Sequence, residues 1–188
     1  KDLAAIYSSI FISALGYGIL MVMIAIRLDA NVKNEILISI CAATQIGAGV
    51  IFARFLPILG GKMGMIRSIY IGSIISAIAS LFLFQYFGYL PFLFCVYLLG
   101  TSLFICGVTR NTVMIDLAPS HMRAIIISIG TMSVAIGNSL GPIILSLIKT
   151  NDSFYSFLLA SSCYLLSVLP LMRLKKVDAN VREEKKLS

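Results

Sequence analysis

The segment RFLPILGGKMGMIR (residues 54–67) places three cations and three glycines between two long apolar runs. The run before it (36–53) and the run after it (68–88) contain no charged residue. Each is close to the ~20 residues that a helix needs to cross the hydrocarbon layer of a bilayer. The segment therefore predicts a tight turn between two transmembrane helices, in which glycines permit a sharp reversal and close approach of the backbone.

The composition places most of this chain in lipid. Of its 188 residues, 59% are hydrophobic and 12% are charged, and the mean hydropathy is +0.99. A soluble domain of this size still exposes ~30% of its chain surface, which would leave too much apolar surface in water. The formal charge of +7 is spread over short loops and the tail rather than over one basic face. We therefore expect a lipid bilayer, and no nucleic acid, as a partner.

Six apolar runs predict six transmembrane spans. The third and fourth runs adjoin, and FGYLP (87–91) separates them because Gly followed closely by Pro signals a turn. The runs are apolar on every side, which favours helices over the alternating strands of a barrel. We predict an all-α membrane protein, a six-transmembrane-helix bundle over residues 1–172 with a basic tail or linker at 173–188. The predicted spans are about 3–26, 36–57, 68–88, 89–110, 124–148 and 153–172.

Lysine and arginine are concentrated on one side of this predicted bundle. The segments after the second and fourth spans, and the tail, carry most of them, with Arg110 assigned to the segment after the fourth span. The loops on the other side carry three, each close to an acidic residue. The positive-inside rule then predicts that both termini are cytoplasmic, in a plasma (inner) membrane. With this assignment no charged residue lies in the middle of a span, so we expect no intramembrane carboxylate for a proton relay.

Small residues recur at every fourth position on three of the spans. Such stripes let helices approach closely in lipid, where no hydrophobic effect acts between helices. For the third span, generic helix contact is the preferred interpretation. For the second and fifth spans an alternative stays open, namely a smooth surface that slides against a partner. The three stripes are Ser39, Ala43 and Gly47; Gly72, Ser76 and Ser80; and Ser133, Gly137 and Gly141.

GNSLGP (137–142) lies deep in the fifth span. Pro142 has no N–H to donate to the carbonyl of Asn138, four residues earlier. The motif predicts a bent helix. The bend either has its polar groups satisfied by a neighbouring helix or lines a path whose shape changes.

Polar side chains inside the spans are few. Tyr17, Gln45, Tyr97 and Asn138 are the candidates for contact with a substrate, although each could equally form a hydrogen bond between helices. The four cysteines all lie in apolar runs without a CxxC pair. We therefore expect neither a metal site nor a cofactor.

Three stretches resemble the major facilitator superfamily of secondary transporters. LGYGILMVMIAIRL (15–28) is similar to the glycine-bearing first helix of drug-efflux members. Residues 54–67 resemble the family's loop motif between helices two and three, Gly-x-x-x-Asp-Arg/Lys-x-Gly-Arg/Lys. MIDLAPSHMR (114–123) followed by GNSLGP resembles the helix four–five loop and the antiporter-type Gly-x-x-x-Gly-Pro motif. The resemblance covers all six spans and implies one six-helix half, most like the N-terminal half of drug-efflux members.

The loop motif departs from the family pattern. Aligned on Lys62 and Gly64, the family's Asp falls on Gly61 and its trailing base on Met65. The helix-four Arg that is associated with proton coupling in the family falls near Val96 and is missing. Both departures are more typical of second halves, whereas the first-helix and helix-five motifs favour a first half.

The resemblance implies efflux-like transport of a small molecule by alternating access. Helices one, two, four and five would face a central cavity, and Met21, which is flexible and polarisable, joins the four polar candidates in its lining. The implied partner is a second six-helix half or a second copy of the chain. The implied gating residues are Gly61, Lys62, Gly64, Arg67, Asp116 and Arg123, and the helix-five motif comprises Gly137, Gly141 and Pro142.

Three other classes of protein are alternatives to one half of a secondary transporter. An enzyme is not expected, because the sequence lacks HExxH, paired intramembrane aspartates and a P-loop. Its single histidine, His121, falls in a predicted cytoplasmic loop. A six-span carrier or channel that works as a homodimer stays open. A nontransporting membrane scaffold also stays open, although a scaffold requires neither the Gly-Pro bend nor the basic inner turn.

Overall fold

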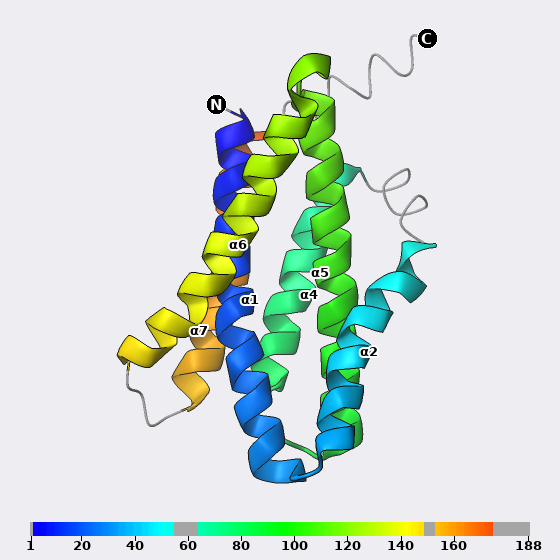
Figure 1. Cartoon of the computed structure of the whole chain (residues 1–188), viewed down its shortest axis with the longest axis vertical. Helices are drawn as coiled ribbons and strands as arrows, with labels where there is room; N and C mark the ends of the chain where they lie inside the picture. The colour runs from blue at the N-terminus through cyan, green and yellow to red at the C-terminus, as the bar shows by residue number, and fades with distance from the viewer. Residues whose placement is uncertain (1, 55–63, 149–152, 175–188) are drawn as a thin grey trace.

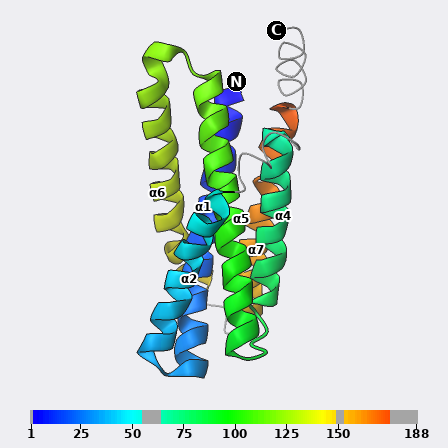
Figure 2. The same ribbon diagram turned by 90° about the vertical axis from the view of Figure 1, so that its right-hand side faces the viewer.

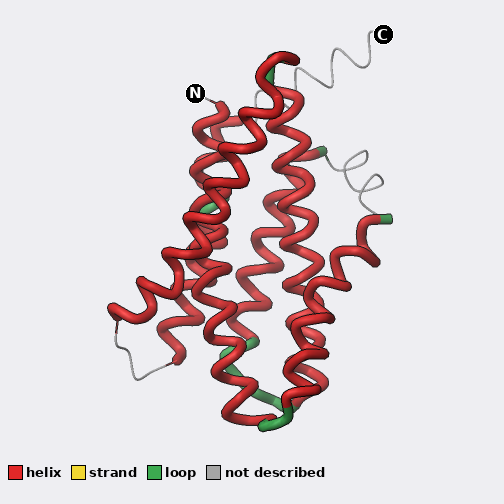
Figure 3. Tube along the Cα trace, viewed as in Figure 1, coloured by secondary structure: helices red, strands yellow, loops and turns green. Residues whose placement is uncertain are grey.

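The computed structural model describes residues 2–54, 64–148 and 153–174, and these parts of the chain are helical without a strand (Figure 3). Six helical stretches within them are long and apolar enough to cross a membrane, the last formed by α7 together with η2. The predicted all-α bundle of six membrane-crossing helices is confirmed. The elements are α1 (Asp2–Val32), α2 (Glu35–Ala53), α4 (Met65–Phe82), α5 (Tyr89–Leu117), η1 (Ser120–Met122), α6 (Arg123–Ile148), α7 (Ser153–Leu166) and η2 (Leu169–Leu174), where η denotes a 3₁₀ helix.

The helices run up and down the long axis of the molecule. The N-terminal end of α1 and the α5–α6 turn lie at one end, and the α1–α2 turn lies at the other (Figure 1). α1 packs mainly against α6 and α7, α5 packs mainly against α4 and α2, and α4 meets α7. Seen from the side, α6 and α4 stand on opposite sides of α1 and α5 (Figure 2). The α1–α6 pair and the α2–α5 pair therefore form two facing walls.

Turn residues explain where α2 and α5 begin. Asn34 caps α2 by accepting a hydrogen bond from the Ile36 N–H at 3.0 Å, as asparagine commonly does at a helix start. Gly88 precedes α5 with a φ of 123°, a conformation that side chains other than glycine's disfavour. Pro91 lies in the first turn of α5, where no N–H is needed within the helix. The predicted break between these two spans is present, but it lies at residues 83–88, and residues 89–91 already belong to α5.

The outside of the bundle is apolar, and its inside contains small hydroxyl groups. Leu90 and Leu147 are 75% and 76% exposed, which suits helices whose solvent is lipid. Inside, the hydroxyls of Ser76 and Ser102 lie 2.7 Å apart and join α4 to α5. Most buried side chains are apolar as well, so the bundle differs from a water-soluble domain in its apolar outer surface.

The small-residue stripe of α4 packs against α5. A Cβ built on Gly72 would lie 2.6 Å from Cys106 Sγ, and Ser76 and Ser80 are buried. The preferred interpretation of this stripe, generic helix contact, is confirmed.

The stripe of α6 lies against α1. Cβ atoms built on Gly137 and Gly141 would come within 2.8 Å and 2.6 Å of atoms of α1. Gly18 of α1 lies against the backbone of Asn138 in return. Because glycine has no side chain, these positions allow the backbones of α1 and α6 to cross closely.

The stripe of α2 has a different environment. Ser39 and Ala43 are exposed, and a Cβ built on Gly47 would meet nothing within 4 Å in the described part of the chain. The same sequence pattern therefore forms a helix contact in α6 and an open surface in α2.

Arg110 is buried inside α5, which corrects its assignment to the segment after the fourth span. That span is predicted to end at residue 110, whereas α5 continues to Leu117. Arg110 is 5% exposed, and Met114, one turn further along, is fully buried. The apolar residues that follow Arg110 extend the buried face of the helix, so the charge does not mark the helix end.

Candidate functional site

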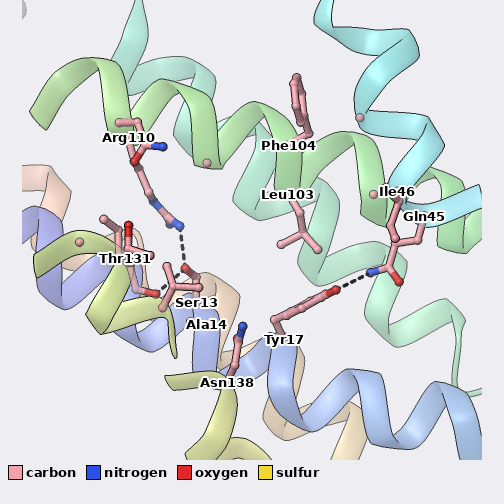
Figure 4. Close-up of a pocket in the computed structure, with 17 residues that line it drawn as sticks. Ser13, Ala14, Tyr17, Gln45, Ile46, Leu103, Phe104, Arg110, Thr131 and Asn138 are labelled. Carbon is pink, nitrogen blue, oxygen red and sulfur yellow. Dashed lines mark hydrogen bonds between the residues drawn. The ribbon is translucent and has the colours of Figure 1, made fainter. Parts of the chain in front are cut away.

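A cavity of about 470 Å³ lies between the α1–α6 pair and the α2–α5 pair (Figure 4). These are the first, second, fourth and fifth spans of the chain, the four that the resemblance assigns to a central cavity. Apolar side chains and four glycines make up much of the lining. Volumes of about 300–1,000 Å³ with a few convergent polar groups are typical of small-molecule sites. The polar lining residues are Ser13, Tyr17, Gln45, Arg110, Asn111, Thr131 and Asn138.

Tyr17 and Gln45 face one another across the cavity. Gln45 Nε2 donates to the Tyr17 hydroxyl at 3.5 Å, a distance at the outer limit for a hydrogen bond (Figure 4). Gln45 is held in place from its backbone, since a Cβ built on Gly100 of α5 would collide with the Gln45 carbonyl. The long side-chain contact leaves both groups able to exchange partners with a bound molecule.

Asn138 lines the cavity from α6 and contains an unsatisfied buried oxygen. Its Oδ1 is buried and has no hydrogen-bond partner among the described residues. Buried polar atoms usually have a partner, so an orphan at a cavity wall points to a ligand, a water molecule or another protein group. The close contact with Gly18 fixes the backbone at this level.

Arg110 reaches from α5 across to α1 and to the turn that follows α7. Its Nη1 donates to Ser13 Oγ at 2.6 Å (Figure 4), and its Nη2 donates to Ser167 Oγ at 3.3 Å. Its Nε has no partner within the described ranges. Among the described residues that line the cavity, Arg110 is the one that carries a charge. The cavity therefore has a positive end at Arg110, where Ser13 accepts its hydrogen bond and Thr131 lies nearby (Figure 4).

Three of the five predicted substrate contacts come together in this cavity. Tyr17, Gln45 and Asn138 line it. Met21 is 37% exposed and Tyr97 is half-buried, and neither is in the lining. Whether any of the five binds a substrate stays a prediction.

The predicted gating residues lie away from the cavity where the structure describes them. Gly64 precedes α4 with a φ of 87°, and Arg67 is exposed one turn later. Asp116 and Arg123, also exposed, flank the α5–α6 turn. Two more predicted members, Gly61 and Lys62, fall outside the described residues. In the helix-five motif, Gly137 and Gly141 are buried against α1 and Pro142 is exposed.

The sequence interpretation missed Arg110 as a cavity residue. A signal was present, because Cys106, Arg110 and Met114 repeat at intervals of four and are all buried. That spacing marks one face of a helix. The four cysteines are free thiols, and the described residues contain no cluster of three His, Cys, Asp or Glu side chains that could hold a metal ion.

Comparison with known proteins identifies the fold. No family model and no curated protein matches the sequence. The crystal structure of a D-xylose–proton symporter matches with a TM-score of 0.72 at 17% sequence identity. The match covers 99% of this chain and 53% of the symporter, so the chain spans about half the length of that protein.

The fold is therefore that of one half of a major facilitator transporter, and the chain is a multi-pass helical membrane protein. At this level of identity the likeness defines the fold alone. The similarity to drug-efflux members in particular stays a prediction.

Proposed function

We propose that this chain transports a small solute across a membrane as one six-helix half of a secondary transporter of the major facilitator type. The observation that carries the proposal is the cavity between the α1–α6 and α2–α5 walls, with polar groups from all four helices. In such transporters the substrate binds near the midplane between two bundles, and one bundle rocks against the other. The likeness to a D-xylose–proton symporter, matched over 53% of its length, supports the same arrangement.

A second bundle would close the open side of the cavity. The small residues of α2, the exposed Ser39 and Ala43 and the half-buried Gly47, offer a surface without bulky side chains on which it could move. The second bundle is either another six-helix half or a second copy of this chain. Cross-linking between two differently tagged copies separates these arrangements.

The residues proposed to contact the substrate are Tyr17, Gln45 and Asn138, with Met21 and Tyr97 as the further candidates. The proposed cytoplasmic gate comprises Gly61, Lys62, Gly64, Arg67, Asp116 and Arg123. The helix-five motif supports export rather than import, because the Gly-x-x-x-Gly-Pro pattern resembles that of antiporters. We propose that the protein lies in the plasma membrane with both termini in the cytoplasm, on the side where lysine and arginine are concentrated.

The proposal is tested by transport in proteoliposomes that contain the protein expressed from its complete reading frame. Uptake of labelled sugars, organic anions and lipophilic cations is measured with and without an imposed pH gradient. We expect uptake of one class that depends on the protein and is reduced by Gln45→Ala and Asn138→Ala, while both variants insert normally. Normal insertion with no uptake of any class above protein-free vesicles would favour the nontransporting scaffold.

A further inference from the structure

The charge of Arg110 is buried without an acidic partner in the described chain. Arg110 is 5% exposed, and its two hydrogen-bond acceptors are the neutral hydroxyls of Ser13 and Ser167. No Asp or Glu is among the described residues that line the cavity. Removing a cation from water without a compensating anion costs several kcal/mol. A charge kept under these conditions at a cavity wall points to an anion that occupies the cavity.

The geometry suits an anion rather than a purely structural clamp. A guanidinium has five N–H donors, and the contacts to Ser13 and Ser167 use one on each terminal nitrogen. The Nε–H has no partner among the residues that the structure describes. That Nε is also fully covered by protein atoms, so the donors available to an anion are the second N–H groups of the two terminal nitrogens, and their hydrogen bonds to a carboxylate are stronger than those to neutral hydroxyls. A clamp between α1, α5 and the turn that follows α7 would need only a neutral donor.

The surroundings of Arg110 can complete such a site. Ser13, Asn111 and Thr131 bring neutral polar groups to the same end of the cavity. Tyr17, Gln45 and Asn138 lie further along, where they could contact the uncharged body of the molecule. A volume of about 470 Å³ accommodates a small organic molecule.

We propose that the Arg110 end of this cavity binds the anionic group of a small organic anion, such as a carboxylate. The inference rests on the proposed transport function, which it deepens by naming the chemical class of the solute. The same anionic group could come instead from a carboxylate elsewhere in the complete protein. A carboxylate of the protein would neutralise the charge of Arg110 permanently, so the cavity would no longer attract free anions.

The test measures the electrostatic potential of the cavity directly and needs no knowledge of the solute. Thr131 lines the cavity and is exposed, so Thr131→Cys introduces a thiol near Arg110. The purified full-length protein in detergent is treated with an anionic and a cationic methanethiosulfonate of similar size, and both rate constants are measured. Asn34→Cys, in the exposed α1–α2 turn, gives the reference ratio. Protein without an added cysteine gives the background, since the native thiols are buried or half-buried.

We expect the ratio of anionic to cationic rate constants at position 131 to exceed the reference by roughly three- to tenfold, because an unpaired positive charge attracts one reagent and repels the other. The excess should fall toward the reference as salt is raised to about 1 M. Adding Arg110→Gln should abolish it, whereas Arg110→Lys should retain it. Arg54→Gln, which removes an exposed charge at the end of α2, should leave it unchanged. If Arg110→Gln does not fold, the salt dependence and the lysine variant still decide.

Three outcomes overturn the inference. In the first, the ratio at position 131 equals the reference, and adding Arg110→Gln makes the cationic reagent react faster. This result identifies a carboxylate of the protein as the permanent partner of Arg110. A high ratio that survives Arg110→Gln assigns the potential to other charges. A thiol at position 131 that reacts with neither reagent shows that the cavity does not admit anions. None of these outcomes depends on transport, so each leaves the proposed function to its own test in proteoliposomes.

Discussion

Gly18 of α1 faces the backbone carbonyl of Asn138 in α6, and a Cβ built on Gly18 would lie 2.5 Å from that oxygen. Asn138 is the residue whose carbonyl loses its helical donor to Pro142. The Asn138 carbonyl therefore lacks its helical N–H donor because of Pro142, and it approaches α1 closely because Gly18 has no side chain. The bend of α6 and its crossing with α1 depend on one local arrangement.

Gly18→Ala is expected to destabilise the protein by about 1–3 kcal/mol, because the added methyl group must displace backbone rather than a flexible side chain. The measurement is the midpoint of thermal unfolding in detergent. Gly47→Ala is the matched control, since the same methyl group enters open space on α2. Its midpoint should stay close to that of the wild type. Equal destabilisation by both substitutions would contradict the described crossing of α1 and α6.

Pro142→Ala is expected to reduce transport severalfold while expression and the unfolding midpoint stay close to wild type. The alanine N–H can bond the Asn138 carbonyl and straighten α6, which stabilises the helix but changes its bend. Uptake and folded yield are measured on the same preparations. A parallel loss of both quantities would support a purely structural role for the proline.

Gly47→Leu is expected to abolish transport without lowering the stability of this bundle. A Cβ at Gly47 meets nothing within 4 Å in the described chain, and the larger leucine side chain would obstruct a second bundle that moves along α2. The readouts are uptake into proteoliposomes and the unfolding midpoint. Full transport by this variant would place the second bundle on another face.

The topology is tested by single cysteines at Asn34 and Ser120, which lie in the α1–α2 turn and in η1 between α5 and α6. The positive-inside rule assigns Ser120 to the cytoplasm and Asn34 to the opposite side. In right-side-out vesicles, a membrane-impermeant maleimide should label Asn34→Cys, and should label Ser120→Cys only after permeabilisation. The reverse pattern would invert the proposed orientation.

Local patterns predicted the number of helices but not the environment of single residues. Charge-free runs of sufficient length, divided at Gly88 and Pro91, predicted six spans because the bilayer sets the length of each helix. Arg110 could not be placed in the same way. The interval of four placed Arg110 on the same helix face as Cys106 and Met114. Its partners Ser13 and Ser167 are 97 and 57 residues away in the sequence, so the local pattern could not show which groups would hold its charge.

The small-residue stripes illustrate the same limit. Gly47 and Gly137 both belong to patterns of period four, yet one faces open space and the other faces α1. The pattern identifies a surface that can be approached closely, and the arrangement of the helices decides what approaches it. Similarly, the sequence indicated Tyr17, Gln45 and Asn138 as rare polar residues, but only the fold brings them to one cavity.

Two glycines on α1 have a mechanical consequence. Gly16 lies against α7, where a Cβ would come within 2.8 Å of Cys163 Cβ, and Gly18 lies against α6. Residues two apart on a helix point in nearly opposite directions, so α1 is gripped from both sides at the same height. At this level α6 and α7 can tilt relative to α1, but sliding either of them along α1 would bring backbone atoms into collision. Movements of these three helices are therefore expected to be tilts about this level rather than shifts along the helix axis.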